Sequence, residues 1–387
     1  MKTKFSSGQL FRLFFLFTLG TYVFTAQHMF QLAEYEGWIS IIIGSIGSVV
    51  LAYFAVHLAK RHPNQEWIDY GKRLLGRWLH GFFIWIVVLF CLTYSAVSMQ
   101  QLANLFVSIY YPTTPDYILT IGFMFCVAVL VSNGLKSIIY TNDILWILMG
   151  ITVTFFSGII LAIPEWDYSM FRMIFHFDWH KINYASLFAL NWTGDVILFL
   201  FLAPEFKTKK SPMVGLVVAV FASCLIIVEG WMFIFLEVGF HVAKRVKFPV
   251  VEFIRFVSTG DFFRNIDHFP ILFALCCLTF TKLCLLLYIA TKLLTGSFRV
   301  KKKGRKYFLY ILVVLSSILA IVFSNNAMFF EDFVISYYFQ GFLLFIKLIP
   351  LIYLIVYGIR KLAAARSLKT VKIEVTSEDE KTTRNTQ

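Results

Sequence analysis

Charged residues are scarce in this sequence. They make up 15% of its 387 residues, whereas an ordinary soluble domain carries about 25%. Hydrophobic residues make up 59% of the chain, and the mean hydropathy is +0.75. One soluble core could not hide so much apolar surface, so lipid must be the solvent for most of it. A soluble enzyme is therefore excluded.

Sequence signatures of catalysis and of metal or cofactor binding are also missing. The chain has no phosphate-binding loop, no nucleophile elbow and no zinc-ligand spacing. Its few cysteines all lie inside apolar runs, where we interpret them as small core residues without disulfide or haem spacing. They are Cys91, Cys126, Cys224, Cys276, Cys277 and Cys284. We therefore expect neither an enzyme nor a bound cofactor or metal.

Acidic residues are fewer than basic ones, which gives a net charge of +13. The basic residues cluster in short connections between apolar runs, as they do beside the cytoplasmic face of a membrane. Membrane topology therefore explains the positive charge, and we expect no nucleic-acid partner.

Ten apolar runs approach or exceed the length of about 20 residues that a helix needs to cross a bilayer. The first lacks a small-residue cleavage site, so we interpret it as a first transmembrane helix rather than a signal peptide. The runs are Gln9–Ala33, Trp38–Ala59, Gly81–Ile109, Tyr117–Asn133, Ile139–Ile163, Tyr184–Pro204, Met213–Phe240, His268–Leu294, Tyr307–Phe323 and Tyr337–Ile359.

The basic residues orient these spans. With the N-terminus in the cytoplasm, the cytoplasmic connections hold 25 Lys and Arg residues and the opposite connections hold seven. This asymmetry predicts that both termini are cytoplasmic. We expect a transmembrane domain over residues 1–366 and a disordered cytoplasmic tail over residues 367–387, because the tail is polar and of mixed charge.

The spans divide into five and five, over residues 9–163 and 184–360. Because five is odd, the second half enters the membrane from the opposite side, which is the geometry of an inverted repeat. The predicted fold is thus an all-α integral membrane protein of about ten transmembrane helices in a 5+5 inverted repeat.

The first span of each half carries a signal for a broken helix. Gly20 lies within Thr18–Tyr22, and Gly194 lies within Asn191–Asp195. Glycine weakens a helix, and neighbouring Thr, Asn or Asp side chains compete for its backbone bonds. Matched breaks of this kind indicate a transporter binding site. The alternative is that both glycines serve close helix packing.

Several charges fall inside the predicted spans. Asp195 and Lys282 lie near the middle of the membrane, where a charge costs at least about 2.5–3.5 kcal/mol. They are the obvious candidates for an ion pair that locks spans six and eight together. The alternative is that one of them holds a substrate ammonium or carboxylate, or carries a proton. Glu229 and Lys347 are further candidates. Gln100, Gln101 and Asn104 share one helix face and are interpreted as contacts between helices.

Four stretches carry a family resemblance. They are Leu16–Thr21, Gly134-Leu135-Lys136 with Asp143-Ile144, Ala203-Pro204-Glu205-Phe206, and Phe248-Pro249 through Gly260–Asp267. Together they resemble the B subunits of bacterial spore germinant receptors, the endospore germination permease family of the amino acid–polyamine–organocation transporter superfamily. The resemblance covers Gln9 to Arg360, although Thr25-Ala26-Gln27 departs from the Leu-Pro that often follows the first break.

The resemblance implies an inverted-repeat fold that binds a nutrient, such as an amino acid, between broken helices one and six. It also implies a second membrane subunit and a lipoprotein subunit as partners, in the inner membrane of the bacterial spore. Carried over by position, the pocket comprises Gly20, Thr21, Tyr22, Asn191, Trp192, Thr193 and Gly194.

Three functions stay open at this point. The first is a germinant-sensing receptor subunit, whose ligand must bind two conformations differently in order to shift them. The second is an amino acid or amine permease, with or without coupling of transport to protons. The third is an ion channel opened by the germinant, with the polar residues of span three along its pore.

Overall fold

The computed structural model describes residues 4–161, 177–206, 212–257, 269–301 and 304–363. These residues are nearly all helical, and they contain one isolated bridge, between Phe5 and Phe206. The longer helices are α1 (Ser7–Ala33), α2 (Gly37–Arg61), α4 (Arg77–Ile109), α5 (Asp116–Ser132), α6 (Leu135–Leu161), α7 (Trp179–Thr193), α9 (Pro212–Glu237), α12 (Phe269–Ser297) and α13 (Arg305–Asn325). The shorter ones are α3 (Trp67–Leu75), α8 (Phe199–Leu202), α10 (Phe240–Ala243), α11 (Pro249–Val257), α14 (Ala327–Ile335) and α15 (Tyr337–Lys347).

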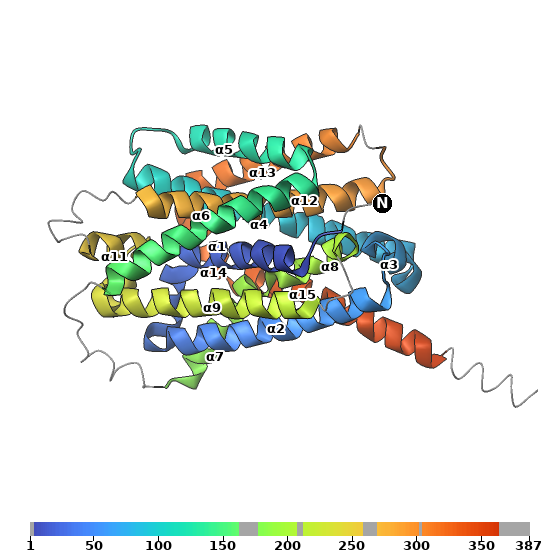
Figure 1. Ribbon diagram of the computed structural model, residues 1–387, viewed down its shortest axis with the longest axis horizontal. Coiled ribbons are helices and arrows are strands. Elements are labelled where there is room, and N and C mark those ends of the chain that lie inside the picture. The colour runs from blue at the N-terminus through green and yellow to red at the C-terminus, as the bar shows by residue number, and fades with distance from the viewer. Residues whose placement is uncertain (1–3, 162–176, 207–211, 258–268, 302–303, 364–387) are drawn as a thin grey trace, which may run out of the picture.

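The long helices run along the longest axis of the molecule, and Figure 1 shows α3 and the N-terminus at one end and α11 at the other. We call these the N-terminal end and the opposite end. Within the described residues, seven helices are long and apolar enough to cross a membrane, or eight if α14 and α15, bent by 47°, form one span. The remaining predicted spans fall on α1, on the shorter apolar helix α5, and on α15 with helical residues 349–363.

Burial separates central helices from peripheral ones. In the most apolar stretch of each span, 89% of residues are buried for Trp179–Glu205 and 83% for Leu272–Ser297, against 33% for Arg305–Asn325. The segment that begins with α7 packs on α2 and α1, while α12 packs on α4 and α1. Span six and α12 therefore form the interior of the bundle, whereas α13 presents much of its apolar surface outward, as a helix facing lipid does.

The predicted break in the first span is wrong. Helix α1 is continuous from Ser7 to Ala33, and the Thr21 hydroxyl donates to the Phe17 carbonyl at 3.4 Å without opening the helical ladder. Gly20 is a close-packing glycine instead. A Cβ there would lie 3.1 Å from Leu278 Cβ and 3.2 Å from its backbone carbonyl. Tyr22 lies within α1, but its side chain is outside the described residues.

The predicted break in span six is confirmed. Helix α7 ends at Thr193, a 3-10 helix follows over Gly194–Leu198, and α8 is a single turn. Another 3-10 turn, Ala203–Glu205, closes the span. The tighter winding shifts the pattern of backbone hydrogen bonds, so carbonyl groups near Asn191 become available to other partners.

Span ten is also interrupted, although the sequence predicted one continuous span over Tyr337–Ile359. Helix α15 ends at Lys347, Leu348 forms a turn, and the chain is helical again over residues 349–363. The cause is Pro350, because proline lacks an N–H and its ring clashes with the carbonyl four residues earlier. The interruption places Lys347 at a helix end in the protein interior.

Candidate functional site

A fully buried ion pair lies at the interruption of span six. Lys347 Nζ of α15 is 2.6 Å from Asp195 Oδ1, and both side chains are at most 1% exposed. Lys347 also donates to the backbone carbonyl of Asn191. Removing two charges from water costs several kcal/mol for each ion unless geometry and further hydrogen bonds compensate. The short distance and the second acceptor supply that compensation for Lys347.

The expected pairing of Asp195 with Lys282 is therefore wrong, because Lys347 occupies that position. Lys282 of α12 instead places its Nζ 3.9 Å from the centre of the Tyr94 ring and 5.6 Å from that of Trp192. An ammonium held over aromatic faces without water gains about 2 kcal/mol or more. Lys282 thus lies in an aromatic cage formed by the Tyr94 and Trp192 rings.

Asn191 joins span six to the bend between α14 and α15. Its side-chain Nδ2 donates at 2.8 Å to both the backbone carbonyl and the Oε1 of Gln340. Gln340 in turn donates from Nε2 to the Val334 carbonyl at 2.7 Å. These buried bonds cross the bend on either side of Ser336. A displacement of the span-six interruption would therefore move α14 and α15 with it.

Thr193 and Gly194 fix the interruption against α2. The hydroxyls of Ser48 and Thr193 are 2.7 Å apart, and Thr193 donates to the Ala189 carbonyl at 2.8 Å. Gly194 leaves room for the lysine: a Cβ there would lie 3.1 Å from Lys347 Cδ and 3.3 Å from Leu51 Cδ1. Glycine is needed here for close approach, since its φ of −74° suits any residue.

A small cavity adjoins these residues. It is lined by Thr18, Thr21, Met29, Ile41, Phe188, Ala189, Trp192, Thr193 and Ile227, and its volume is about 20 Å³. A water molecule needs about 10–15 Å³ by this measure, so the cavity has room for one or two waters but not for an amino acid. The site is therefore closed, and a nutrient could bind only after helices around it separate.

Polar atoms without partners lie at the cavity, on its lining residues Thr18 and Trp192, and next to it on Asp195. The Thr18 hydroxyl, the Trp192 Nε1 and the second carboxylate oxygen of Asp195 are buried and make no hydrogen bond within the described residues. The Tyr94 hydroxyl lies close to Asp195 and Thr21. Buried polar groups in proteins are nearly always satisfied, so this arrangement has the capacity to bond water or a polar ligand.

The predicted site residues therefore divide into two groups. Asn191, Trp192, Thr193, Gly194 and Thr21 lie together with Asp195, whereas Glu229 is exposed on the outer surface of α9. Glu229 thus lies within a span but not in the protein interior, because the buried side of α9 is formed by small and apolar residues such as Ser223 and Ile227. Sequence reasoning missed Tyr94, Ser48 and Gln340. Pro350 was the one sequence signal that span ten is interrupted near Lys347 and that this lysine therefore lies at a helix end.

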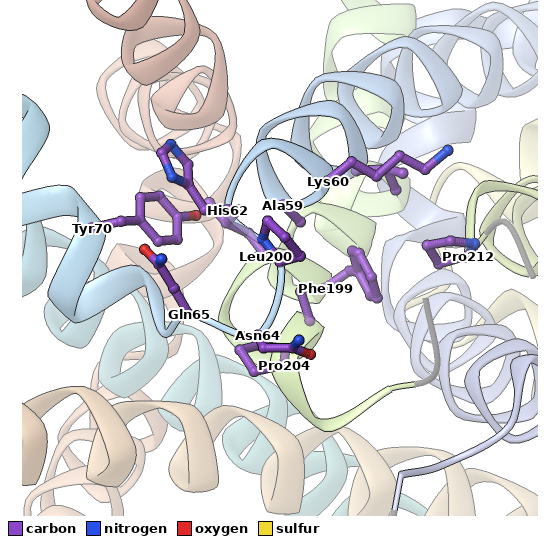
Figure 2. A pocket seen from close by; sticks show the side chains of 13 residues that line it. Ala59, Lys60, His62, Asn64, Gln65, Tyr70, Phe199, Leu200, Pro204 and Pro212 are labelled. Atoms are coloured by element: carbon purple, nitrogen blue, oxygen red, sulfur yellow. The ribbon is translucent and has the colours of Figure 1, made fainter. Parts of the chain in front are cut away.

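A second pocket opens at the N-terminal end of the bundle. Figure 2 shows the His62 and Tyr70 rings side by side there, with Lys60 and Pro212 across the pocket. The two rings stack with centroids 4.3 Å apart, and burial together with Arg73 and Arg61 lowers the pKa of His62. Close to this pocket, Lys292 Nζ lies 3.5 Å from Glu205 and 3.8 Å from Glu66. These contacts join span six, α3 and α12 at this end.

Two solved symporters share this architecture. The chain is similar to a Na⁺-coupled sialic acid symporter in a substrate-bound outward-open state, with a TM-score of 0.56, 12% identity, and coverage of 90% of this chain and 77% of the other. It is also similar to a nucleobase-cation-symport-1 family transporter in a closed conformation, with a TM-score of 0.60, 14% identity, and coverage of 90% and 76%. This likeness confirms the predicted inverted-repeat transporter fold.

Relatives among characterised proteins point to one family. The chain is 24% identical over 305 residues to spore germination protein XB of Bacillus anthracis, which covers 76% of this chain and 81% of the relative. It is 22% identical over 297 residues to spore germination protein KB of Bacillus subtilis (strain 168), with coverage of 74% and 77%. Residues 4–328 match the family described as spore germination protein, or spore permease. The chain is therefore a multi-pass membrane protein that belongs to the spore germination protein family.

Proposed function

We propose that this protein is the nutrient-sensing subunit of a spore germination receptor, and that it binds a small nutrient such as an amino acid at the span-six interruption. The observation that carries the proposal is the buried Asp195–Lys347 pair at that interruption, in a chain of the spore germination family. The pair, the caged Lys282 and the unpartnered Trp192 Nε1 offer both signs of charge and a hydrogen-bond donor to a polar ligand.

The ligand acts by stabilising an open form of the site. A nutrient cannot fit a cavity of about 20 Å³, so it binds only the conformation in which the helices around the cavity have separated. Its binding free energy then favours that conformation, as any ligand that distinguishes two states must do. The Asn191–Gln340 bonds transmit the change from span six to α14 and α15.

The partners and location follow from the same proposal. A second membrane subunit and a lipoprotein subunit detect the conformation, in the inner membrane of the spore. Both chain termini face the cytoplasm, which puts the N-terminal end on the cytoplasmic side and the opposite end, with Glu34 and α11, on the outer side. The supporting argument is the asymmetry of Lys and Arg between the two sets of connections.

A pair of matched variants tests the binding site. Thr18 and Thr279 both carry buried hydroxyls without partners, but Thr18 lines the cavity and Thr279 does not. Thr→Val keeps the shape of either side chain, so neither variant should unfold the protein. We expect Thr18→Val to raise the nutrient dose for half-maximal germination about tenfold and Thr279→Val to leave it unchanged. If both variants and wild type need the same nutrient dose for half-maximal germination, the cavity is not part of the nutrient site.

Deleting the gene tests the function itself. Purified spores of the deletion strain should lose germination in response to particular nutrients, while uptake in growing cells stays normal. The similarity to symporters over 90% of the chain favours a permease as the second candidate. A permease predicts the reverse: normal germination with lost uptake of one solute, which collapses with the proton gradient if transport is proton-coupled.

A further inference from the structure

A pocket at the opposite end of the bundle, lined mostly by polar and charged residues, has no role in the site described above. Helix α4 contributes Gln100, Gln101 and Asn104, and α1 contributes Gln27. Lys247, just before α11, and Glu331 of α14 complete its charged rim. Gln100 lies six residues beyond Tyr94 on α4, so the pocket is about 9 Å further along that helix from the central site at 1.5 Å per residue.

Gln100 is the most buried polar residue of this pocket. Its side chain is 1% exposed, and neither its amide nitrogen nor its amide oxygen has a hydrogen-bond partner within the described residues. Among the described residues, Gln100 thus makes none of the hydrogen bonds between helices that its sequence position suggested. An amide buried without partners costs free energy. The arrangement is explained if something that both accepts and donates hydrogen bonds occupies the pocket.

The rim of the pocket carries one charge of each sign. Lys247 Nζ and Glu331 Oε1 are 3.8 Å apart, and their side chains are 41% and 47% exposed. A long, solvated ion pair of this kind contributes little stability, so a ligand can replace it at small cost. The neighbouring Lys244 is similarly exposed, but it pairs at 3.4 Å with Glu34 and does not line the pocket.

We propose that this pocket is a second ligand site, which takes the zwitterionic head of a free α-amino acid. The ligand carboxylate pairs with Lys247, its ammonium pairs with Glu331, and the Gln100 amide bonds to both groups from below. The pocket has a volume of about 30 Å³ while the ion pair is closed, so the ligand enters by separating Lys247 from Glu331. The nutrient nature of the ligand rests on the proposed function, whereas the recognition of a zwitterion rests on this geometry alone.

Analogues that lack one charge make the test specific. The probes are an L-amino acid to which the spores respond, its decarboxylated amine and its deaminated carboxylic acid, each titrated against the purified full-length chain in lipid nanodiscs. Wild type should bind the amino acid at least tenfold more tightly than either analogue. Lys247→Gln should lose the discrimination against the amine, and Glu331→Gln should lose the discrimination against the acid. Lys244→Gln, the matched control, should behave as wild type.

Other outcomes overturn the proposal. If both rim variants weaken binding of all three probes equally, the ion pair merely supports the fold. If neither differs from Lys244→Gln, and Gln100→Met also binds as wild type does, the pocket holds only water. Spore germination separates this failure from that of the proposed function. If gene deletion abolishes the response but the rim variants germinate with a normal dose–response, the proposed function stands and only the second site is contradicted.

Discussion

Helix α1 and the interrupted span six carry similar local sequences and fold differently. Each has a glycine with threonine beside it, at Gly20-Thr21 and Thr193-Gly194. In α1 the glycine meets the backbone of Leu278 and the helix continues. In span six the Lys347 ammonium donates a hydrogen bond to the Asn191 carbonyl and pairs with Asp195. A glycine permits an interruption, but inside a membrane protein a partner for the released backbone group is what stabilises it.

The strongest test of this comparison removes that partner. Lys347→Met leaves Asp195 buried without its cation, which should cost about 3–5 kcal/mol. We expect low yields and a much reduced melting temperature in detergent. The double variant Asp195→Leu with Lys347→Met removes both charges and should recover most of the loss. Wild-type stability in the single variant would contradict the role assigned to the pair.

The two glycines should respond differently to alanine. Gly20→Ala forces a methyl group against the backbone of α12, which cannot yield easily, and overpacking of this kind costs about 1–3 kcal/mol. Gly194→Ala meets side-chain carbons of Lys347 and Leu51. Because alanine tolerates the φ of −74°, the lower conformational entropy of its unfolded chain offsets part of that crowding, by about 0.4–1 kcal/mol.

We therefore expect Gly20→Ala to lower the melting temperature more than Gly194→Ala does. Gly194→Ala should instead have the larger effect on the nutrient dose needed for germination, because it displaces Lys347. The opposite order in both measurements would mean that Gly20 belongs to the site and Gly194 to the packing.

The hydroxyls next to the glycines give a smaller contrast. Thr193→Val breaks the hydrogen bond to Ser48 across two helices, which should cost about 1 kcal/mol. Thr21→Val loses a longer bond to a carbonyl of its own helix and should cost less. Thermal unfolding of the purified variants compares them, and a larger loss for Thr21→Val would contradict the packing described for α1.

The smallest expected effect is a pH dependence outside the spans, at His62. Burial and neighbouring arginines lower the pKa of His62 in the folded protein. Its contribution to stability is therefore complete above the unfolded pKa of about 6.5 and is lost as the pH falls through the lower folded pKa. His62→Phe keeps the stacking on Tyr70 and should reduce the difference in melting temperature between pH 8 and pH 5. If the difference in melting temperature between pH 8 and pH 5 is the same in His62→Phe as in wild type, the pH dependence comes from other groups.

The sequence predicted what depends on local composition and missed what depends on tertiary placement. The ten apolar runs correspond to helical segments because each must bury its own backbone bonds in lipid. The break at Gly194 was predictable because Asn191, Thr193 and Asp195 gather beside it. The partner of Asp195 was not, since spans eight and ten both offer a lysine and only packing decides between them. Pro350, three residues after Lys347, was the overlooked indication that span ten is interrupted.

The aromatic cage of Lys282 has an electrical consequence. Among the described residues at the centre of the bundle, Asp195 pairs with Lys347, and Lys282 is a second buried basic side chain, which lies over two aromatic rings. A full elementary charge that crosses the membrane field gains or loses about 2.3 kcal/mol for each 100 mV. If a protonated Lys282 moves along the membrane normal when the site opens, the equilibrium between the closed and open forms responds to membrane voltage as well as to the ligand.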